Sequence, residues 1–268
     1  MTTSEPGMPD ESSGHQDEMK EAQEIQLGLL PREIPQLHGY EIAAWLPARV
    51  VSGDSFDLMT FPGSTLGLSI ADVSGKGMPA ALLASNLHAL VRATAETISS
   101  PSKLCEKVNR EISRRVASGR FISFFYGLLD GVSQRFTYTN AGHNPPILLR
   151  RDSSILRPEE GGMLLGISRN SNYRQGEIHL NDGDRLLLYT DGVTDALDPG
   201  GKEFSEARLV QFLKENGQLG AGKLQEKLAE TIAAFGAGNL MDDITMIVVA
   251  VDSACESAPR TMSVGAMR

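Results

Sequence analysis

Apolar residues recur along the chain with two spacings, one typical of strands and the other typical of helices. Short apolar or alternating runs predict strands at residues 40–46, 66–71, 121–129, 135–139, 147–149, 185–189 and 244–251. Apolar residues three and four positions apart predict helices at residues 19–30, 79–98, 101–116, 206–214 and 224–235. Pro79 suits the first turn of a helix, where a missing amide costs nothing.

The order of these segments bears on the fold class. Strands come in runs and helices arrive in pairs, whereas a doubly wound parallel sheet places one helix between successive strands. Gly131 and the Asn144-Pro145-Pro146 cluster mark turns between the central strands, which predicts antiparallel neighbours. The pattern therefore favours an α+β fold built from layers of sheet and helix.

The two ends of the chain differ in composition from its middle. Residues 1–17 are acidic, rich in Ser and Gly and free of Lys and Arg, which predicts a disordered tail. Residues 253–268 are predicted to form a flexible C-terminal tail. Residues 18–36 are predicted to hold a linker helix, which either packs on its own domain or pairs with a second copy. A single domain is expected over residues 37–252.

Charge and composition exclude several classes of function. The chain of 268 residues has a net charge of -9, which argues against a protein that binds nucleic acid by neutralising phosphates. No apolar run approaches the length of a membrane span, and the first residues lack the basic and apolar parts of a signal peptide. Cys105 and Cys255 show no metal-binding or redox spacing. We expect a cytoplasmic protein with reduced thiols.

Acidic residues stand at the ends of several predicted strands. An apolar strand leads into Asp72 and another leads into Asp191, and glycines follow both residues. Asp242 and Asp243 stand just ahead of the last predicted strand, and Asp54 follows a glycine. If these strands are neighbours, the carboxylates meet at one sheet edge and repel one another unless a cation lies between them.

Hard divalent cations fit such a group, because Mg²⁺ and Mn²⁺ prefer oxygen ligands and flanking glycines let a backbone carbonyl approach. Other acidic residues near glycines, namely Asp57, Asp195 and Asp198, are interpreted as ordinary turn residues. His143 lies in a loop with strong turn signals and is interpreted as a structural hydrogen-bonding residue.

Other chemistries find no support in the motifs. Gly77 and Met78 follow Lys76, so the Gly-Lys pair lacks the spacing of a P-loop. Ser74 has no recognisable histidine and aspartate partners in the order of a catalytic triad, and no GxSxG motif is present. The five histidines are scattered without the spacing of a zinc site.

Five motifs in fixed order resemble a known family. The segments VSGDSFD, ADVSGKGMPAALLAS, NAGHNPP, LYTDGVTDA and DDITMIVV are similar to those of the PPM-type metal-dependent serine/threonine phosphatases, in particular the SpoIIE/RsbU-like branch. The similarity extends over about residues 20–252. It implies an α-β-β-α sandwich, in which two antiparallel sheets pack face to face between helix pairs. It also implies a centre of two Mn²⁺ or Mg²⁺ ions.

The resemblance implies roles for residues at the matching positions. Asp72 bridges the two ions and the carbonyl of Val73 binds one of them. Asp191 and Asp242 hold the other ion. Asp54 lies in the outer shell and orients bound water.

Two further residues and two departures belong to the same comparison. Asp243 supports the site without direct ligation, and Arg49 is a candidate to bind phosphate, with a solvated surface role as the alternative. The family usually has two glycines before the first aspartate, whereas Ser52 precedes Gly53 here. Ser55 stands where an aromatic residue is common.

The implied reaction is hydrolysis of phosphoserine or phosphothreonine on a protein by a hydroxide that two metal ions activate. The implied substrate is a phosphorylated anti-sigma-factor antagonist, with a separate activator protein and a homodimer through the N-terminal helix as further partners. Two alternatives stay open. One is a metal-dependent enzyme acting on phosphodiesters or nucleotides, and the other is a catalytically silent module of the same fold that binds a phosphoprotein.

Overall fold

The chain folds into two sheets and two pairs of helices, preceded by one long helix. The structure is a computed structural model, and it describes residues 11–47, 51–116, 119–238, 243–252 and 260–261. The helices are α1 (Glu11–Leu29), α2 (Met78–Ala95), α3 (Pro101–Arg115), α4 (Ser205–Asn216) and α5 (Ala221–Phe235), with a short 3₁₀ turn η1 (Asp191–Val193). Among the described helices, none has the length and apolar character that crossing a lipid bilayer requires.

The strands form two main sheets. One contains β3 (Ser55–Phe61), β4 (Thr65–Val73), β5 (Ile122–Asp130), β6 (Arg135–Ala141), β9 (Gly161–Gly162) and β10 (Gly176–His179), in the order β10-β6-β5-β4-β3 with β9 beside β6. The other contains β2 (Tyr40–Trp45), β7 (Ile147–Leu149), β8 (Ile155–Leu156), β11 (Arg185–Tyr189) and β12 (Met246–Val251), in the order β2-β12-β11-β7-β8. Neighbouring strands are antiparallel throughout, except that β9 runs parallel to β6.

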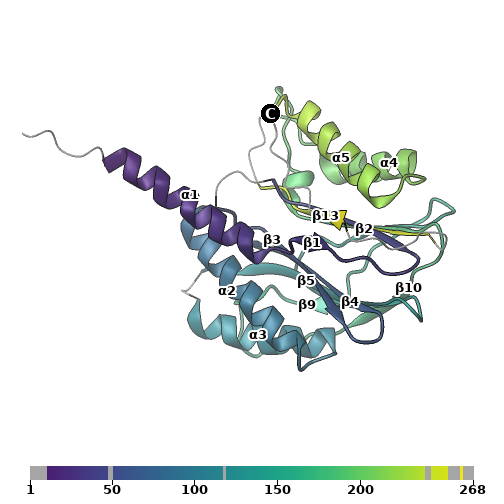
Figure 1. Ribbon diagram of the computed structural model, residues 1–268, viewed down its shortest axis with the longest axis horizontal. Coiled ribbons are helices and arrows are strands. Elements are labelled where there is room, and N and C mark those ends of the chain that lie inside the picture. The colour runs from purple at the N-terminus through teal and green to yellow at the C-terminus, as the bar shows by residue number, and fades with distance from the viewer. Residues whose placement is uncertain (1–10, 48–50, 117–118, 239–242, 253–259, 262–268) are drawn as a thin grey trace, which may run out of the picture.

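Figure 1 shows the two sheets with helices on their outer sides. Three apolar clusters hold these layers together. The central cluster lies between the two sheets and includes Leu68 from one sheet and Val249 from the other. A second cluster joins the outer face of the five-stranded sheet to α4 and α5, and a third joins the six-stranded sheet to α2 and α3. This is the α-β-β-α sandwich that the family resemblance implies, and the predicted α+β fold class is confirmed.

Helix α3 shows how the local sequence produces these elements. Ser100 precedes the helix and its side chain accepts a hydrogen bond from the amide of Lys103 at 3.4 Å, and Pro101 occupies the first turn. Leu104, Val108 and Ile112 follow at helical spacing and are fully buried against the sheet.

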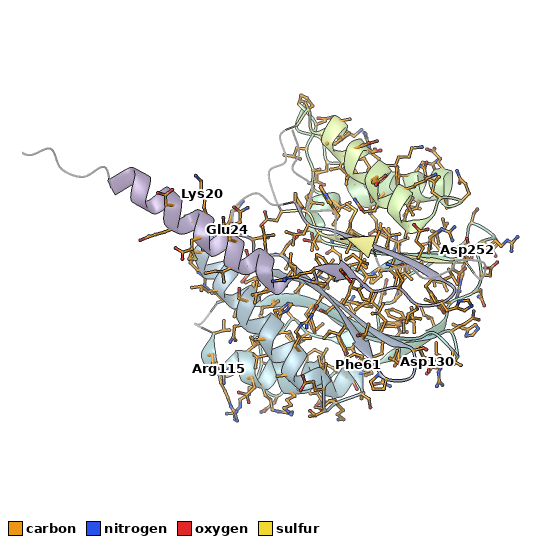
Figure 2. The ribbon with its side chains drawn as sticks, in the orientation of Figure 1. Lys20, Glu24, Phe61, Arg115, Asp130 and Asp252 are labelled. Atoms are coloured by element: carbon orange, nitrogen blue, oxygen red, sulfur yellow. The ribbon has the colours of Figure 1, made fainter. Side chains whose placement is uncertain are left out.

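The two ends differ from the sequence-based prediction. Helix α1 begins at Glu11, inside the segment 1–17 that was expected to be disordered, and extends beyond the sandwich (Figure 1). Figure 2 shows Lys20 and Glu24 on this helix, far from Asp252. At the C-terminal end, β13 (Arg260–Thr261) pairs with β1 (Glu33–Ile34), although residues 253–268 were expected to be flexible. Backbone pairing of this kind leaves little signal in hydrophobic periodicity.

Candidate metal centre

The acidic residues come from both sheets. Asp72 lies near the end of β4 and pairs with Ser123 of β5 in the six-stranded sheet. Asp191 is separated from β11 of the five-stranded sheet by Thr190 alone and begins η1. The sequence predicts one sheet edge if the strands are neighbours, and β3 with β4 and β11 with β12 are neighbours, each pair in its own sheet. Asp54 and Asp243 lie within electrostatic reach of each other because the ends of the two facing sheets meet.

Asp191 and Asp243 are brought together by close backbone packing. A Cβ atom at Gly192 would lie 1.9 Å from the carbonyl oxygen of Asp243, so this position has room for glycine only. The amide of Thr190 donates to the carbonyl of Thr245 at 3.0 Å, which extends the pairing of β11 with β12. The segment after β11 therefore lies against the segment before β12.

Asp54 connects this pair of strands with the six-stranded sheet. It precedes β3 and is 5% exposed. Its Oδ2 atom accepts hydrogen bonds from the hydroxyls of Thr190 and Thr245, both at 2.7 Å. The amide of Thr245 donates to the Thr190 hydroxyl at 3.0 Å, which leaves that hydroxyl hydrogen for Asp54. The two threonines thus hold one carboxylate oxygen at the junction between the sheets.

The charges around Asp54 are unfavourable for its ionised form. Burial raises the pKa of Asp54 well above its ordinary value, and repulsion from Asp72 and, less strongly, from Asp243 adds to this effect. The hydrogen bonds from Thr190 and Thr245 act in the opposite direction. Acids from two other segments of the chain therefore lie within electrostatic reach of Asp54.

A backbone carbonyl faces the same region. A Cβ atom at Gly53 would lie 3.2 Å from the carbonyl oxygen of Val73 and 3.7 Å from that of Gly75. Gly75 itself has a φ of 100°, a conformation that favours glycine. The loop before β3 and the loop after β4 therefore approach closely, with the Val73 carbonyl directed toward Gly53.

Ser52 contributes to the arrangement of both neighbouring acids. Its Oγ atom donates to Oδ2 of Asp243 at 2.7 Å and accepts a bond from the amide of Asp54 at 3.0 Å. The departure from the usual two glycines thus places a hydroxyl between two acidic segments. Asp243 was predicted to support the site, and its position beside Ser52 is consistent with that role.

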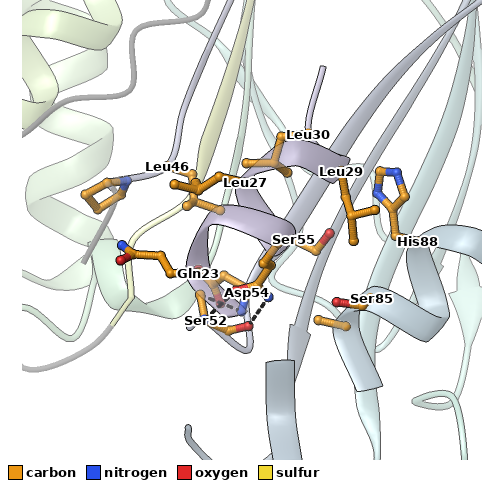
Figure 3. Close-up of a pocket in the computed structure, with 13 residues that line it drawn as sticks. Gln23, Leu27, Leu29, Leu30, Leu46, Ser52, Asp54, Ser55, Ser85 and His88 are labelled. Atoms are coloured by element: carbon orange, nitrogen blue, oxygen red, sulfur yellow. Dashed lines mark hydrogen bonds between the residues drawn. The ribbon is translucent and has the colours of Figure 1, made fainter. Parts of the chain in front are cut away.

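A pocket adjoins this loop (Figure 3). Leu27 and Leu29 of α1 line it together with Ser85 and His88 of α2. Asp54 also lines this pocket. The first helix therefore lies within one side-chain layer of the acidic residues.

His143 is buried behind Asp72. Its Nδ1 atom lies 2.9 Å from Oγ of Ser123, the residue that pairs with Asp72, and its amide donates to Asn140 Oδ1 at 2.7 Å. Burial lowers the pKa of His143 from 6.5 to about 4, although the backbone of Tyr189 favours the charged form. These contacts support the interpretation of His143 as a structural residue.

The three acids interpreted as turn residues have different surroundings. Asp198 lies in an exposed turn and accepts bonds from the amides of Gly200 and Lys202, as expected. Asp195 follows η1 and accepts a bond from the hydroxyl of Thr194. For Asp57 the interpretation is wrong, because this residue lies within β3 and is buried in an ion pair.

Two predicted site residues, Asp242 and Arg49, lie outside the described residues. In the part of the chain that the structure describes, no three His, Cys, Asp or Glu side chains are grouped so that they could hold a metal ion. The donor set nevertheless fits a hard cation, because the buried carboxyl of Asp54, the acids Asp72 and Asp243 that repel it and the nearby carbonyl of Val73 supply the oxygen donors that Mg²⁺ and Mn²⁺ prefer.

The layered fold with acids between the ends of its sheets defines the class of PPM-type protein serine/threonine phosphatases. The SiaA-PP2C domain of Pseudomonas aeruginosa has the same fold, with a TM-score of 0.79 and 20% identity over 91% of this chain and 100% of that domain. RsbX, solved in complex with magnesium, also shares the fold, with a TM-score of 0.60 and 18% identity over 81% of this chain and 98% of RsbX.

The family follows from the sequence comparisons. The family model of stage II sporulation protein E matches residues 62–252. Phosphoserine phosphatase RsbU of Bacillus subtilis (strain 168) is 31% identical over 234 residues, which cover 87% of this chain and 69% of RsbU. The chain therefore belongs to the SpoIIE family, the SpoIIE/RsbU-like branch of the PPM-type phosphatases, as its motifs indicated.

Sequence reasoning missed the polar residues that hold the acids in place. Thr190 and Thr245 stand beside predicted acids within the motifs LYTDG and DDIT, so their positions could have drawn attention to them. Ser52 was noticed only as a departure from the family pattern. Nothing in the local sequence indicates that Gln26, on the first helix, contacts the loop before β3.

Proposed function

We propose that this chain hydrolyses phosphoserine or phosphothreonine on a regulatory protein. The observation that carries the proposal is the place of Asp54, whose pKa is raised by burial, by repulsion from Asp72 and, less strongly, by repulsion from Asp243, two acids from other segments of the chain. A fold maintains such an arrangement at a cost in stability, which a bound cation offsets. The sequence identity of 31% to a phosphoserine phosphatase supports the choice of substrate class.

Residues present in the chain fit a centre for two Mn²⁺ or Mg²⁺ ions. In this proposal Asp72 would be a ligand of both ions. The carbonyl of Val73 would bind one of them, and Asp191 and Asp242 would bind the other. When bound, such ions lower the pKa of water and neutralise the charge that develops on a phosphoryl group. The magnesium complex of RsbX, which has the same fold, supports this choice of ion.

The remaining polar residues position and shield the acids. Thr190 and Thr245 hold one oxygen of Asp54, so its other oxygen is the one available to orient a water molecule. Ser52 holds one oxygen of Asp243 in the same way. Arg49 stays a candidate to bind the substrate phosphate, as the family comparison implies.

We propose a phosphorylated anti-sigma-factor antagonist as the physiological substrate, with a separate activator protein as the source of control. The support is the similarity to RsbU, of which the match covers 69%. Incubation with candidate phosphoproteins, followed by measurement of released phosphate, tests this choice.

Helix α1 is the proposed surface for a homodimer. Ile25 and Leu29 on this helix are 64% and 37% exposed, which is costly for large apolar side chains in water. A second copy of the same helix would cover them. We expect the unaltered protein to have the mass of a dimer in light scattering, and Ile25→Arg to have a lower mass. The same mass for the variant and the unaltered protein would reject the dimer.

A direct assay separates this function from its alternatives. We expect release of phosphate from a phosphoserine peptide and from p-nitrophenyl phosphate with Mn²⁺, and no release with a chelator. Binding of the peptide without hydrolysis would favour the catalytically silent module. Faster hydrolysis of a phosphodiester than of either monoester would favour the phosphodiester enzyme, which the net charge of -9 disfavours.

A further inference from the structure

A side chain of the first helix is fixed to the loop that carries Asp54. The amide nitrogen Nε2 of Gln26 donates to the carbonyl of Ser52 at 2.6 Å, and the backbone amide of Ser52 donates to Oε1 of Gln26 at 2.8 Å. Gln26 therefore pairs with the backbone of Ser52 as a neighbouring strand would. Figure 3 shows Ser52 and Asp54 beside α1.

The side chain of the same serine points to the acids. Ser52 is 4% exposed, and its Oγ atom bonds both the carboxylate of Asp243 and the amide of Asp54. Hydrogen bonds to ionised groups are among the stronger ones in proteins, and a buried polar group that loses its partner is costly. A displacement of α1 that breaks the Gln26 bonds thus leaves the Ser52 backbone unsatisfied and frees the hydroxyl to move.

We propose that Gln26 and Ser52 are positioning residues that couple the location of α1 to the orientation of Asp54 and Asp243. The inference rests on the proposed function for its consequence in catalysis, but the coupling itself is a property of the folded chain. Because α1 extends beyond the sandwich, a partner bound to its exposed part can shift the helix without touching the acids.

The coupling continues past Ser52 through bonds already described. Asp54 accepts the hydroxyl of Thr245, and the amide of Thr245 bonds to Thr190 at the end of β11. Loss of the Gln26 bonds should therefore weaken the hydrogen bonds of Thr245, just before β12 in the other sheet. A role restricted to anchoring the helix would loosen only the loop around Ser52.

Hydrogen–deuterium exchange of the full chain in a chelator tests this directly. In Gln26→Leu we expect the amides of Asp54 and Thr245 to exchange about fivefold faster than in the unaltered protein, the effect of losing about one hydrogen bond. The matched control is Glu24→Leu, a substitution at an exposed position of the same helix, which should leave both amides unchanged. Unchanged exchange at Thr245 in Gln26→Leu would overturn the proposal.

Calorimetric titration with Mn²⁺ gives a second readout. We expect Gln26→Leu and Ser52→Ala each to weaken Mn²⁺ binding about tenfold, the double variant to be no weaker than the worse single variant, and Ser52→Thr to restore binding. At saturating Mn²⁺ the KM for a phosphoserine peptide should be unchanged in Gln26→Leu. Additive losses in the double variant would show two independent effects and contradict the coupling.

These measurements also separate two kinds of failure. If the unaltered protein binds no Mn²⁺ and releases no phosphate, the proposed function fails, and the exchange rate at Thr245 still decides the coupling. If instead the unaltered protein is active and the Gln26→Leu and Glu24→Leu variants have the same amide exchange rates and the same affinity for Mn²⁺, only the coupling is rejected.

Discussion

Two buried aspartates near the start of β3 differ in what surrounds their charge. Asp57 is 2% exposed and is clamped by Arg92, whose Nε and Nη2 atoms lie 2.6 and 2.7 Å from the two carboxylate oxygens. Asp54 is 5% exposed, and among the described residues it receives side-chain hydrogen bonds only from the hydroxyls of Thr190 and Thr245. The carboxylate of Asp57 is paired with a cation of the chain itself, whereas that of Asp54 lies near other acids.

This difference separates a structural acid from one that we propose to be functional. The bidentate pair with Arg92 balances the charge of Asp57 and gives each carboxylate oxygen a hydrogen bond, and His88 lies 3.6 Å from the same carboxylate. Among the residues that the structure describes, no cation pairs with Asp54 in this way, and burial together with repulsion from Asp72 and Asp243 raises its pKa. Burial alone therefore says little about function, whereas burial without an internal cation indicates where an external cation binds.

The largest expected effect is loss of catalysis on removing a carboxylate that holds metal. We expect Asp72→Asn to lower metal-dependent release of phosphate by about 1,000-fold or more, since metal ions supply several kcal/mol of charge stabilisation. Asp191→Asn should behave alike. The control is Asp198→Asn in an exposed turn, and full activity in Asp72→Asn would refute its assignment as a ligand.

A pH titration of stability sharpens the comparison with a third buried group, His143. The native pKa of His143 is about 4, below its usual 6.5, so the unfolded chain binds a proton in this range that the native chain does not. Stability should therefore fall by about 3 kcal/mol as the pH falls from about 6.5 to 4. Urea unfolding at several pH values measures this. His143→Gln should remove that part of the slope, and an equal slope in both proteins would contradict the buried neutral histidine.

Breaking the ion pair should affect the fold and spare the chemistry. We expect Asp57→Asn to lower the free energy of unfolding by about 2 kcal/mol, less than for a fully buried pair because the Arg92 side chain is 48% exposed. The kcat of the folded protein should stay within about twofold of the unaltered value. Urea unfolding and a phosphatase assay measure the two quantities, and a large loss of kcat with stability retained would place Asp57 in the site.

The smallest expected change has the opposite sign. Without metal, Asp54→Asn should raise the free energy of unfolding by about 1 kcal/mol, because it removes a charge that burial and two neighbouring acids disfavour. Urea unfolding in a chelator measures this, and Asp57→Asn is the matched control at a neighbouring position. A destabilised Asp54→Asn would mean that the Thr190 and Thr245 bonds outweigh the repulsion.

Much of the fold could be predicted from the sequence, and the exceptions have physical causes. Strands β7 (Ile147–Leu149) and β11 (Arg185–Tyr189) have the predicted bounds, because continuous apolar runs end at clear turn residues. Strand β3 was missed because Asp57 interrupts its apolar pattern, and only the pairing with Arg92 makes that position a buried one. Strand β10 (Gly176–His179) lacks an apolar run altogether.

The site was predictable at the level of residues and not at the level of contacts. Strand ends followed by glycine marked Asp72 and Asp191 as candidates, since their place at a strand end depends on local sequence alone. The approach of Asp54 to Asp243 across two sheets depends on how those sheets pack, which no local pattern encodes. The links from Gln26 to Ser52 and from Ser52 to Asp243 join residues far apart in the chain and appear only in the folded protein.

The most direct test of a cation centre between the two sheets is an anomalous difference map, collected near the manganese absorption edge from crystals soaked in Mn²⁺. We expect the strongest peaks within ligand distance of the carboxylates of Asp72 and Asp191, and no peak beside Asp57, whose charge Arg92 already balances. A map at saturating Mn²⁺ with no peak near Asp72 and Asp191, or with its strongest peak elsewhere on the protein, would contradict the proposed centre.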